Sequence, residues 1–293
     1  MNIPNGLFPG GLTVGRWTML YVRLIRGGFR YRFKLARLTR WPLLGRMMDR
    51  AFFEGDDIIV LPKQAAGHIV DIPVDLPAPM RESMVIPSEV VRHFVERSRY
   101  HFLMSYCICR TSAHCQDYPR DLGCLFLGKA TLKIDPRLGR MVSREEALAH
   151  LDRCEEAGLV HLIGRNKIDS VWTSAKPKED LLTICNCCPC CCLWKMLPEL
   201  DPGISGKLTR MPGVHLSVDP GRCNGCGRCV EGCYVRAIGM VEDVARIDQE
   251  MCKGCARCAH LCPERAITLH LDDPEFLVHS VRRLEPLVDV TRE

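Results

Sequence analysis

Residues 214–271 read VHLSVDPGRCNGCGRCVEGCYVRAIGMVEDVARIDQEMCKGCARCAHLCPERAITLHL. This stretch holds two runs of four cysteines, and both runs have the spacing C-x2-C-x2-C-x3-C with an offset of 29 residues at every cysteine. The first run is Cys223, Cys226, Cys229 and Cys233, and the second is Cys252, Cys255, Cys258 and Cys262. The flanks repeat too, since Val218-Asp219 matches Ile247-Asp248 and residues 236–238 match residues 265–267. We infer an internal duplication around which the chain is organised.

This spacing suits an iron–sulfur cube, which needs four thiolates that converge on one small object. Three cysteines at two-residue intervals on a tight loop supply three corners. Gly225, Gly227 and Gly254 let the backbone turn closely around the cube. Paired C-x2-C units also suit structural zinc, but eight cysteines in this spacing favour iron–sulfur clusters over zinc.

The stretch resembles a bacterial-type ferredoxin domain with two [4Fe-4S] clusters. In that motif the fourth ligand of each cluster comes from the other repeat, so the resemblance implies two crossed ligand sets. Cluster I then takes Cys223, Cys226, Cys229 and Cys262, and cluster II takes Cys233, Cys252, Cys255 and Cys258. One departure is Tyr234, which stands where the second repeat has Pro263. It is expected to change the packing beside Cys233 and to leave the ligand count unchanged.

The composition of the chain points to a reducing compartment. Its 293 residues, 47% of them hydrophobic, suffice for two domains with a real core. Arg16, Arg23 and Arg26 interrupt any apolar run of a signal peptide, and no stretch approaches the roughly 18 apolar residues of a membrane-spanning helix. The 19 cysteines are therefore expected in the cytoplasm, as metal ligands rather than disulfides.

The net charge of +5 belongs to the N-terminal segment, because residues 1–60 carry ten Lys or Arg against four Asp or Glu. Residues 16–53 interleave these charges with apolar side chains, and Gly27-Gly28 is expected to break the helix. Three interpretations stay open. The segment packs on the rest of the protein, or it lies peripherally on the anionic inner face of a membrane, or, least favoured, it contacts nucleic acid.

A second cysteine system starts with CICRTSAHCQDYPRDLGC at residues 107–124. In an extended chain Cys107 and Cys109 face the same side, and a loop that folds back brings Cys115 and Cys124 to the same metal. Residues 182–192 then read LTICNCCPCCC, with six cysteines in eight residues, more than one zinc ion can take. This string completes the first site, or forms an iron–sulfur site of its own, or holds one structural metal beside several bystanders. The candidate ligands for a third iron–sulfur cluster or zinc are Cys107, Cys109, Cys115, Cys124, Cys185, Cys187, Cys188 and Cys190.

Residues 80–195 resemble a cysteine-rich domain found with ferredoxin modules in strict anaerobes. The runs that carry this resemblance are CICR, CLFLG, GLVHLIG and ICNCC. The resemblance implies metal binding and transfers no substrate to this chain.

Several elements can be predicted between these sites. A strand is expected at Asp57–Leu61, a helix capped by Ser88, and a helix capped by Ser143 and Glu146 with Cys154 buried inside it. Residues 159–162 and 170–173 are expected to pair as a hairpin, and residues 193–213 to form a proline-containing linker. A last helix is expected to follow Asp273.

The predicted fold class is α+β. A basic amphipathic segment (1–60) precedes a cysteine-rich α+β domain (61–213), a ferredoxin-like pseudo-two-fold dicluster domain (214–272) and a C-terminal helix or tail (273–293).

Three functions follow from these observations. The first is an electron carrier that exchanges electrons with redox protein partners. The second is the electron-transfer part of a reductase whose reactive site is the Cys107–Cys192 system, with Arg110 and His114 beside it. The third is a sensor that touches DNA through its helix and hairpin. Dinucleotide, nucleotide-phosphate and hydrolase motifs are missing, so an oxidoreductase component is favoured over a stand-alone enzyme.

Overall fold

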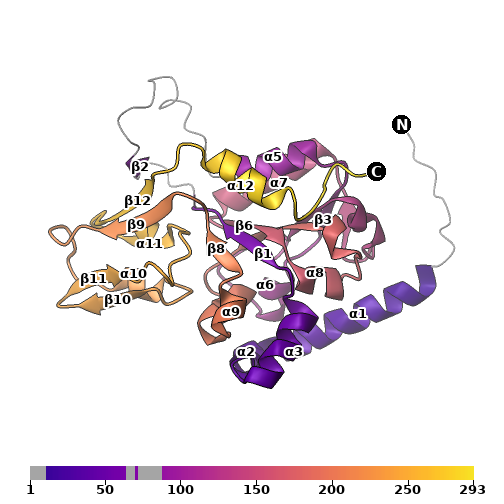
Figure 1. Cartoon of the computed structure of the whole chain (residues 1–293), viewed down its shortest axis with the longest axis horizontal. Coiled ribbons are helices and arrows are strands. Elements are labelled where there is room, and N and C mark those ends of the chain that lie inside the picture. Colours follow the sequence, from indigo (N-terminus) through magenta and orange to yellow (C-terminus); the bar gives the residue numbers. More distant parts are fainter. Residues whose placement is uncertain (1–10, 64–69, 72–87) are drawn as a thin grey trace.

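The computed structural model describes the backbone of residues 11–63, 70–71 and 88–293, and the side chains of residues 18–63 and 88–293 (Figure 1). Helices and mixed sheets alternate along the chain, which confirms the predicted α+β class. Within these residues no helix is long and apolar enough to cross a membrane.

A seven-stranded sheet organises the cysteine-rich part, in the order β5-β3-β4-β7-β6-β1-β8. Its pairs are antiparallel except for β1 with β8. The strands are β1 (Asp57–Val60), β3 (His101–Met104), β4 (Leu125–Leu127), β5 (Gly139–Met141), β6 (Val160–Arg165), β7 (Leu182–Cys187) and β8 (Leu208–Arg210). The strand predicted at 57–61 is thus confirmed. Ile59 and Val60 of this strand, and Leu61 just after it, are fully buried.

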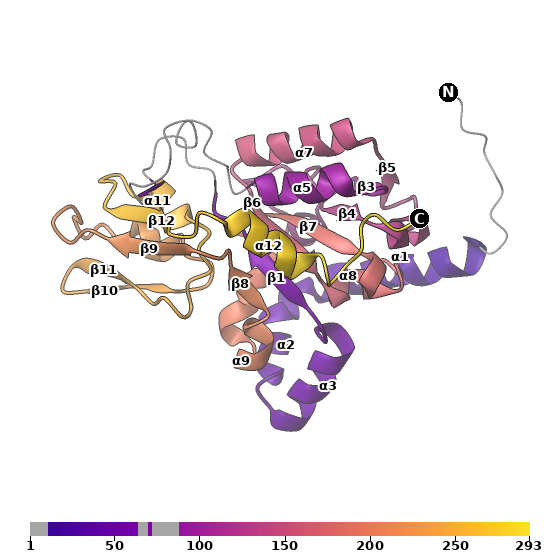
Figure 2. The ribbon, with the colours of Figure 1, turned by 45° about the horizontal axis from the view of Figure 1, so that its top comes forward.

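Strand alternation divides the core between the two faces of this sheet. On β4, Leu125 and Leu127 join the cluster that includes α5 (Glu89–Arg97), α7 (Arg144–Glu156) and α12 (Phe276–Leu284). Phe126 points to the other face, where it meets Trp172 of α8 (Lys167–Trp172) and the cluster that contains Val22 of α1 (Gly11–Gly28). Figure 2 shows α5 and α7 above the sheet, with α8 and α1 below it.

The N-terminal segment packs on the protein. Helix α1 ends at Gly28, as expected from the glycine pair, and it is followed by η1 (Phe29–Tyr31), α2 (Arg32–Leu38) and α3 (Pro42–Phe52). Val22, Phe29 and Ala36 are buried, while Leu24, Trp41 and Leu43 remain exposed. One face of the N-terminal segment thus packs on the rest of the protein, as the first of the three interpretations predicts. Another face of the segment remains exposed to solvent.

The predicted hairpin at residues 159–173 is wrong, because residues 170–173 belong to α8 and its C-cap rather than to a strand. Asp169 accepts hydrogen bonds from Asn166 Nδ2 at 2.8 Å and from Trp172 Nε1 at 2.9 Å. These bonds close a helical turn where the sequence pattern indicated an extended one. The hypothesis of DNA contact relied on this hairpin and is therefore weakened.

The predicted linker at residues 193–213 is also wrong. It contains η4 (Leu193–Glu199), α9 (Pro202–Ser205) and β8, and Trp194, Leu197 and Leu200 are buried. The Glu199 carboxylate binds Arg37 at 2.8 Å and Arg236 at 2.9 Å. This part of the chain thus joins the N-terminal helices to the C-terminal cysteine repeat.

Three predicted helices are present. The helix after Ser88 is α5, although the Ser88 side chain makes no capping hydrogen bond. The capping box of Ser143 and Glu146 starts α7, and Cys154 is fully buried in that helix. Helix α12 starts at Phe276, and the Asp273 carboxylate accepts a bond from the Glu275 backbone N–H just before it.

The C-terminal cysteine repeat folds as two copies of strand, loop, short helix and strand. The first copy holds β9 (Val214–Val218), α10 (Arg228–Glu231) and β10 (Ile238–Val241), and the second holds β11 (Val244–Ile247), α11 (Arg257–Leu261) and β12 (Ile267–Leu271). Strands β9 and β12 pair with each other, as do β10 and β11. This mutual exchange gives the repeat its pseudo-two-fold form. Strand β2 (Val70–Asp71) extends the β9–β12 pair and runs parallel to β12. This strand pairing connects the cysteine-rich part to the repeat.

Candidate metal centres

Four thiols of the repeat surround one small pocket near its outer end. The pocket is lined by Cys223, Cys226, Cys229 and Cys262 together with apolar side chains such as Ala245 and Ile267. The backbone N–H of Ala266 donates to the Cys262 sulfur at 3.3 Å. Gly225 and Gly227 both have φ of +72°, so the loop follows a left-handed path that keeps the backbone close to the pocket. The structure thus groups the four thiols that were assigned to cluster I.

The other four thiols gather on the side of the repeat that faces the large sheet. Burial raises the pKa of Cys258 well above its ordinary value, and the nearby thiols of Cys255, Cys252 and Cys233 add to the rise. Burial likewise raises the pKa of Cys255 to about 11. The Ala237 backbone N–H donates to the Cys233 sulfur at 3.2 Å, which repeats the Ala266 bond one repeat earlier. This is the group assigned to cluster II.

Both groups fit iron–sulfur clusters on their chemistry. Four thiols crowded in an apolar site resist ionisation unless a bound cation offsets their charge. The backbone donors to sulfur are the hydrogen bonds that such clusters use to set their potentials. Cys226 is exposed whereas its equivalent in the second repeat, Cys255, is half-buried, so the first group reaches closer to solvent at that position.

Comparison with protein families identifies this part of the chain. Residues 222–266 match the family described as "4Fe-4S dicluster domain". The chain therefore carries a ferredoxin-type dicluster domain near its C-terminus, as the resemblance implied, and iron–sulfur electron transfer is supported. Comparisons with curated proteins and with solved structures found no match.

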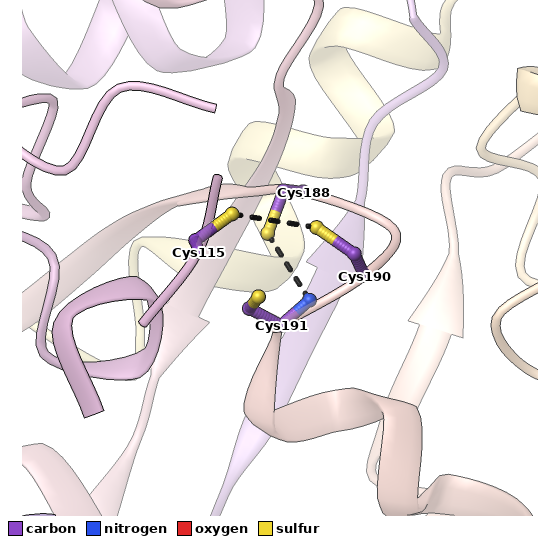
Figure 3. Close-up of side chains that lie close together, drawn as sticks. All are labelled: Cys115, Cys188, Cys190 and Cys191. Atoms are coloured by element: carbon purple, nitrogen blue, oxygen red, sulfur yellow. Dashed lines mark hydrogen bonds between the residues drawn. The ribbon is translucent and has the colours of Figure 1, made fainter. Parts of the chain in front are cut away.

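A compact cysteine tetrad lies in the cysteine-rich part (Figure 3). It consists of Cys115, which follows α6 (Ile108–Ser112), and of Cys188, Cys190 and Cys191 from the turn after β7. All four sulfurs lie within 4.8 Å of one another, and Cys115 and Cys190 are 3.5 Å apart. A tetrahedral metal with bonds of about 2.3 Å sets its sulfurs about 3.8 Å apart. The tetrad therefore has the dimensions of a single-metal site.

The tetrad corrects the predicted ligand sets in two ways. Cys191 was missed, although it stands in the same turn as Cys188 and Cys190. Cys115 was grouped with Cys107, Cys109 and Cys124, and the structure separates it from them. The reason is that residues 107–109 do not form a strand: Cys107 has extended backbone at the N-cap position of α6, and Cys109 lies within that helix. Cys115 lies beyond the end of α6. Residues 107–124 therefore contribute cysteines to two different sites.

The remaining predicted cysteines form a second group. Cys124 and Cys185 have their sulfurs 3.8 Å apart, and Cys187 and Cys192 have theirs 3.0 Å apart. Cys107 and Cys109 complete the group, and all six line one cavity, which Cys188 of the tetrad also lines. Cys192 was also missed by the sequence analysis. The dense string thus contributes to both groups. Cys188, Cys190 and Cys191 in the turn belong to the tetrad, whereas Cys185, Cys187 and Cys192 belong to the second group.

Arg110 and His114, which were predicted to lie beside the reactive site, differ in burial and in their contacts. His114 is exposed and belongs to no candidate metal group among the described side chains. The Arg110 side chain is fully buried and donates to the Asn186 carbonyl at 2.8 Å and to the Leu122 carbonyl. Burial alone would lower the pKa of the Arg110 guanidinium, but nearby thiols, Cys107 and Cys188 first among them, raise it overall. A permanent positive charge therefore lies between the tetrad and the six-cysteine group.

Proposed function

We propose that this protein is an electron-transfer protein with two [4Fe-4S] clusters in the dicluster domain. Cluster I is held by Cys223, Cys226, Cys229 and Cys262, and cluster II by Cys233, Cys252, Cys255 and Cys258. The observation that carries the proposal is the small pocket lined by three cysteines of the first repeat and by Cys262 of the second. This crossing is the arrangement of two-cluster ferredoxins.

The residues of the domain have distinct tasks in this proposal. Bound clusters supply reversible one-electron chemistry. The exposed Cys226 brings the first site to the surface, where a redox protein partner can approach. Arg257, beside Cys258, donates to the Cys187 carbonyl and holds the second site against the cysteine-rich part. The Ala237 and Ala266 backbone donors stabilise charge on the sulfurs and thereby influence the potentials.

The tetrad of Cys115, Cys188, Cys190 and Cys191 is proposed to hold one structural metal ion. Four thiolates leave no open position, which is typical of structural zinc. Bound there, the ion ties the turn after β7 to the segment that follows α6. Its role is then to fix the cysteine-rich part, with no share in electron transfer.

Metal and sulfide content after anaerobic purification tests the proposal. We expect at least about eight iron atoms, as many acid-labile sulfides, and about one zinc per chain. Cys226→Ala should abolish the signals of one cluster, with a loss of up to about four iron atoms. Cys154→Ala serves as the control for iron content, because Cys154 is buried in α7 beside the tetrad and belongs to neither group of dicluster thiols. Iron far below eight in fully reconstituted wild-type protein would refute the proposal.

A peripheral membrane contact is proposed for the N-terminal helices on a separate observation. Trp41, Leu43 and Met47 are 66%, 71% and 65% exposed, at the start of α3 and just before it. They lie in a segment with Arg40, Arg46 and Arg50, and exposed apolar side chains among cations suit an anionic lipid surface. The expected partner is thus the headgroup layer of an anionic membrane.

Flotation with anionic and neutral lipid vesicles tests this contact. Wild-type protein should float with anionic vesicles and stay behind with neutral ones. The double substitution Leu43→Glu and Met47→Glu should abolish flotation. Leu132→Glu is the matched control, since Leu132 is an exposed leucine, at 54%, in another part of the chain. Absence of wild-type flotation at low salt would exclude the contact.

A further inference from the structure

Seven cysteines line one cavity beneath the large sheet, which has a volume of about 430 Å³. One of them, Cys188, belongs to the tetrad, and the other six are Cys107, Cys109, Cys124, Cys185, Cys187 and Cys192. Its remaining wall is mostly apolar and includes Phe29 of η1 and Ile168 of α8. That volume falls in the range of pockets that hold small molecules and cofactors. The question is what such a thiol-lined cavity binds.

The six sulfurs are not gathered as the ligands of one metal ion are. Cys124 and Cys185 have their sulfurs 3.8 Å apart, and Cys187 and Cys192 have theirs 3.0 Å apart. Among the described side chains, the tetrad is the one group of three or more whose ligand atoms all lie within 4.8 Å. No three of the six cysteines therefore approach each other as closely as the tetrad does.

The dicluster domain offers an internal standard for this spacing. Its two groups of four thiols, which suit iron–sulfur cubes, also fail to meet the 4.8 Å limit. Wider spacing is expected, because several metal atoms and sulfides stand between the thiolates of a cluster, whereas one ion draws its ligands together. Like the two cluster sites, the six-cysteine cavity holds no three thiols that lie as close together as those of the tetrad.

Buried polar contacts hold the cysteine-bearing segments in place. On β7, Asn186 points away from Cys185 and Cys187, as alternation in a strand requires. Its amide donates to the Gly123 carbonyl at 2.8 Å, directly before Cys124. Arg110, directly after Cys109, donates to the Asn186 carbonyl at 2.8 Å. Asn186 and Arg110 are 2% and 0% exposed. Three segments that are distant in sequence are thereby fixed around one cavity, which is the preorganisation expected of a metal centre.

The cavity also adjoins the second cluster site. Tyr234 is 7% exposed and packs in the core cluster that includes Cys192. Cys187 of the cavity and Cys252 and Cys255 of the second cluster site pack against the same core cluster. The Tyr234 phenol thus lies near thiols of both sites. Arg257, next to Cys258, donates to the Cys187 carbonyl.

We propose that these six cysteines form the binding site of a third, polynuclear iron–sulfur cluster that lies beside cluster II. At least four of the six serve as ligands, from α6, β4, β7 and the chain after it. Its electron exchange with cluster II rests on the proposed function: one site is oxidised by one electron as the other is reduced, and no bond changes. Binding of the third cluster does not depend on the first two.

Iron and sulfide analysis of matched variants tests the proposal. Wild-type protein, reconstituted anaerobically, should hold clearly more than the roughly eight iron atoms of the dicluster domain. Cys124→Ala with Cys185→Ala should remove the excess of iron and sulfide and leave zinc unchanged. Cys190→Ala should remove zinc and leave iron unchanged. Equal iron in the wild type and in the Cys124→Ala, Cys185→Ala variant would overturn the proposal.

Two further measurements separate this result from the proposed function and from misfolding. Cys226→Ala with Cys255→Ala removes dicluster ligands, and the iron that depends on Cys124 and Cys185 should persist in that background. Its persistence supports the third site even if the dicluster assignment fails. Mössbauer spectra of the unmodified protein need no variant, and they should contain iron beyond two cubanes. Spectra accounted for by two cubanes alone would refute the third cluster.

Discussion

The Arg257 guanidinium donates a hydrogen bond to the backbone carbonyl oxygen of Cys187. Arg257 stands between Cys255 and Cys258 of the dicluster domain, and Cys187 ends strand β7 of the cysteine-rich part. The two parts are therefore linked by a side chain that neighbours the second cluster site. The equivalent residue of the first repeat, Arg228, is exposed, whereas Arg257 is 7% exposed. Arg228 can therefore serve as the matched control for Arg257.

Arg257→Gln should lower the free energy of unfolding by about 1.5–3 kcal/mol, because it removes a charged hydrogen bond and leaves a buried carbonyl without its donor. Arg228→Gln should change it by less than about 0.5 kcal/mol, as is usual for surface positions. Urea unfolding of anaerobic protein, followed by cluster absorbance and circular dichroism, measures both. Equal effects of the two substitutions would show that the Arg257 contact contributes nothing.

Tyr234 is the residue by which the first repeat departs from the second, and its phenol is buried. Among the described residues its Oη has no hydrogen-bond partner. Tyr234→Phe should therefore keep or slightly raise stability, since an unsatisfied buried hydroxyl is costly. Tyr234→Ala should lower stability by about 3–5 kcal/mol, as large aromatic truncations in a core do. Thermal and urea unfolding measure both, and a destabilising Phe substitution would reveal a partner for the hydroxyl.

The dicluster domain was predictable because its signal is local and repeated. Each set of three cysteines lies within seven residues, and the fourth comes from a repeat offset by 29 residues. The left-handed glycines at 225, 227 and 254 agree with the same pattern. Here spacing along the chain and proximity in space nearly coincide, so a sequence pattern identifies the neighbours.

The cysteine-rich part could not be predicted to the same depth, because its sites assemble across the sheet. Cys115 meets Cys190 across 75 positions, and Cys124 meets Cys185 across 61. Register between β4 and β7 decides that Cys124 meets Cys185, and no local pattern encodes it. One signal was available: in TICNC a strand places Cys185 and Cys187 on one side and Asn186 on the other.

Two errors of secondary structure have side-chain causes. The segment at 170–173 looked like a strand, but the Asp169 carboxylate gathers Asn166 and Trp172 into a helical turn. The segment at 193–213 looked like a linker because of its prolines. Pro202 instead occupies the first turn of α9, a position where its missing N–H costs nothing.

The loops around the first cluster site allow a graded glycine test. A Cβ on Gly225 would lie 2.9 Å from the Asp243 carbonyl oxygen, whereas one on Gly227 would meet nothing within 4 Å. Gly227→Ala should thus cost only the left-handed strain of about 1–2 kcal/mol. Ala256, its equivalent in the second repeat, already adopts φ of +59°. Gly225→Ala should cost more and lower cluster occupancy. Iron content and unfolding of both variants measure the difference, and equal losses would contradict this account.

Asp56 is a buried carboxyl whose charge bears on stability at neutral pH. Its Oδ1 accepts the Lys167 backbone N–H at 2.7 Å, at the start of α8. Burial raises the pKa of Asp56 to about 7, and the nearby Asp169 carboxyl adds to the rise. A carboxyl with a raised folded pKa stabilises the fold below its unfolded pKa of about 4, and this contribution is lost as the pH rises through about 7.

Asp56→Asn tests that account, because the amide oxygen can still accept the Lys167 N–H but carries no proton equilibrium. Between pH 6 and 8 the wild type should lose about 1 kcal/mol more unfolding free energy than the variant. The variant should therefore become the more stable protein at pH 8. Effects of Asp169 and of the metal sites cancel to first order in the comparison, since both proteins contain them. Urea unfolding at a series of pH values measures the difference, and parallel stability curves would mean that Asp56 is already ionised below pH 6.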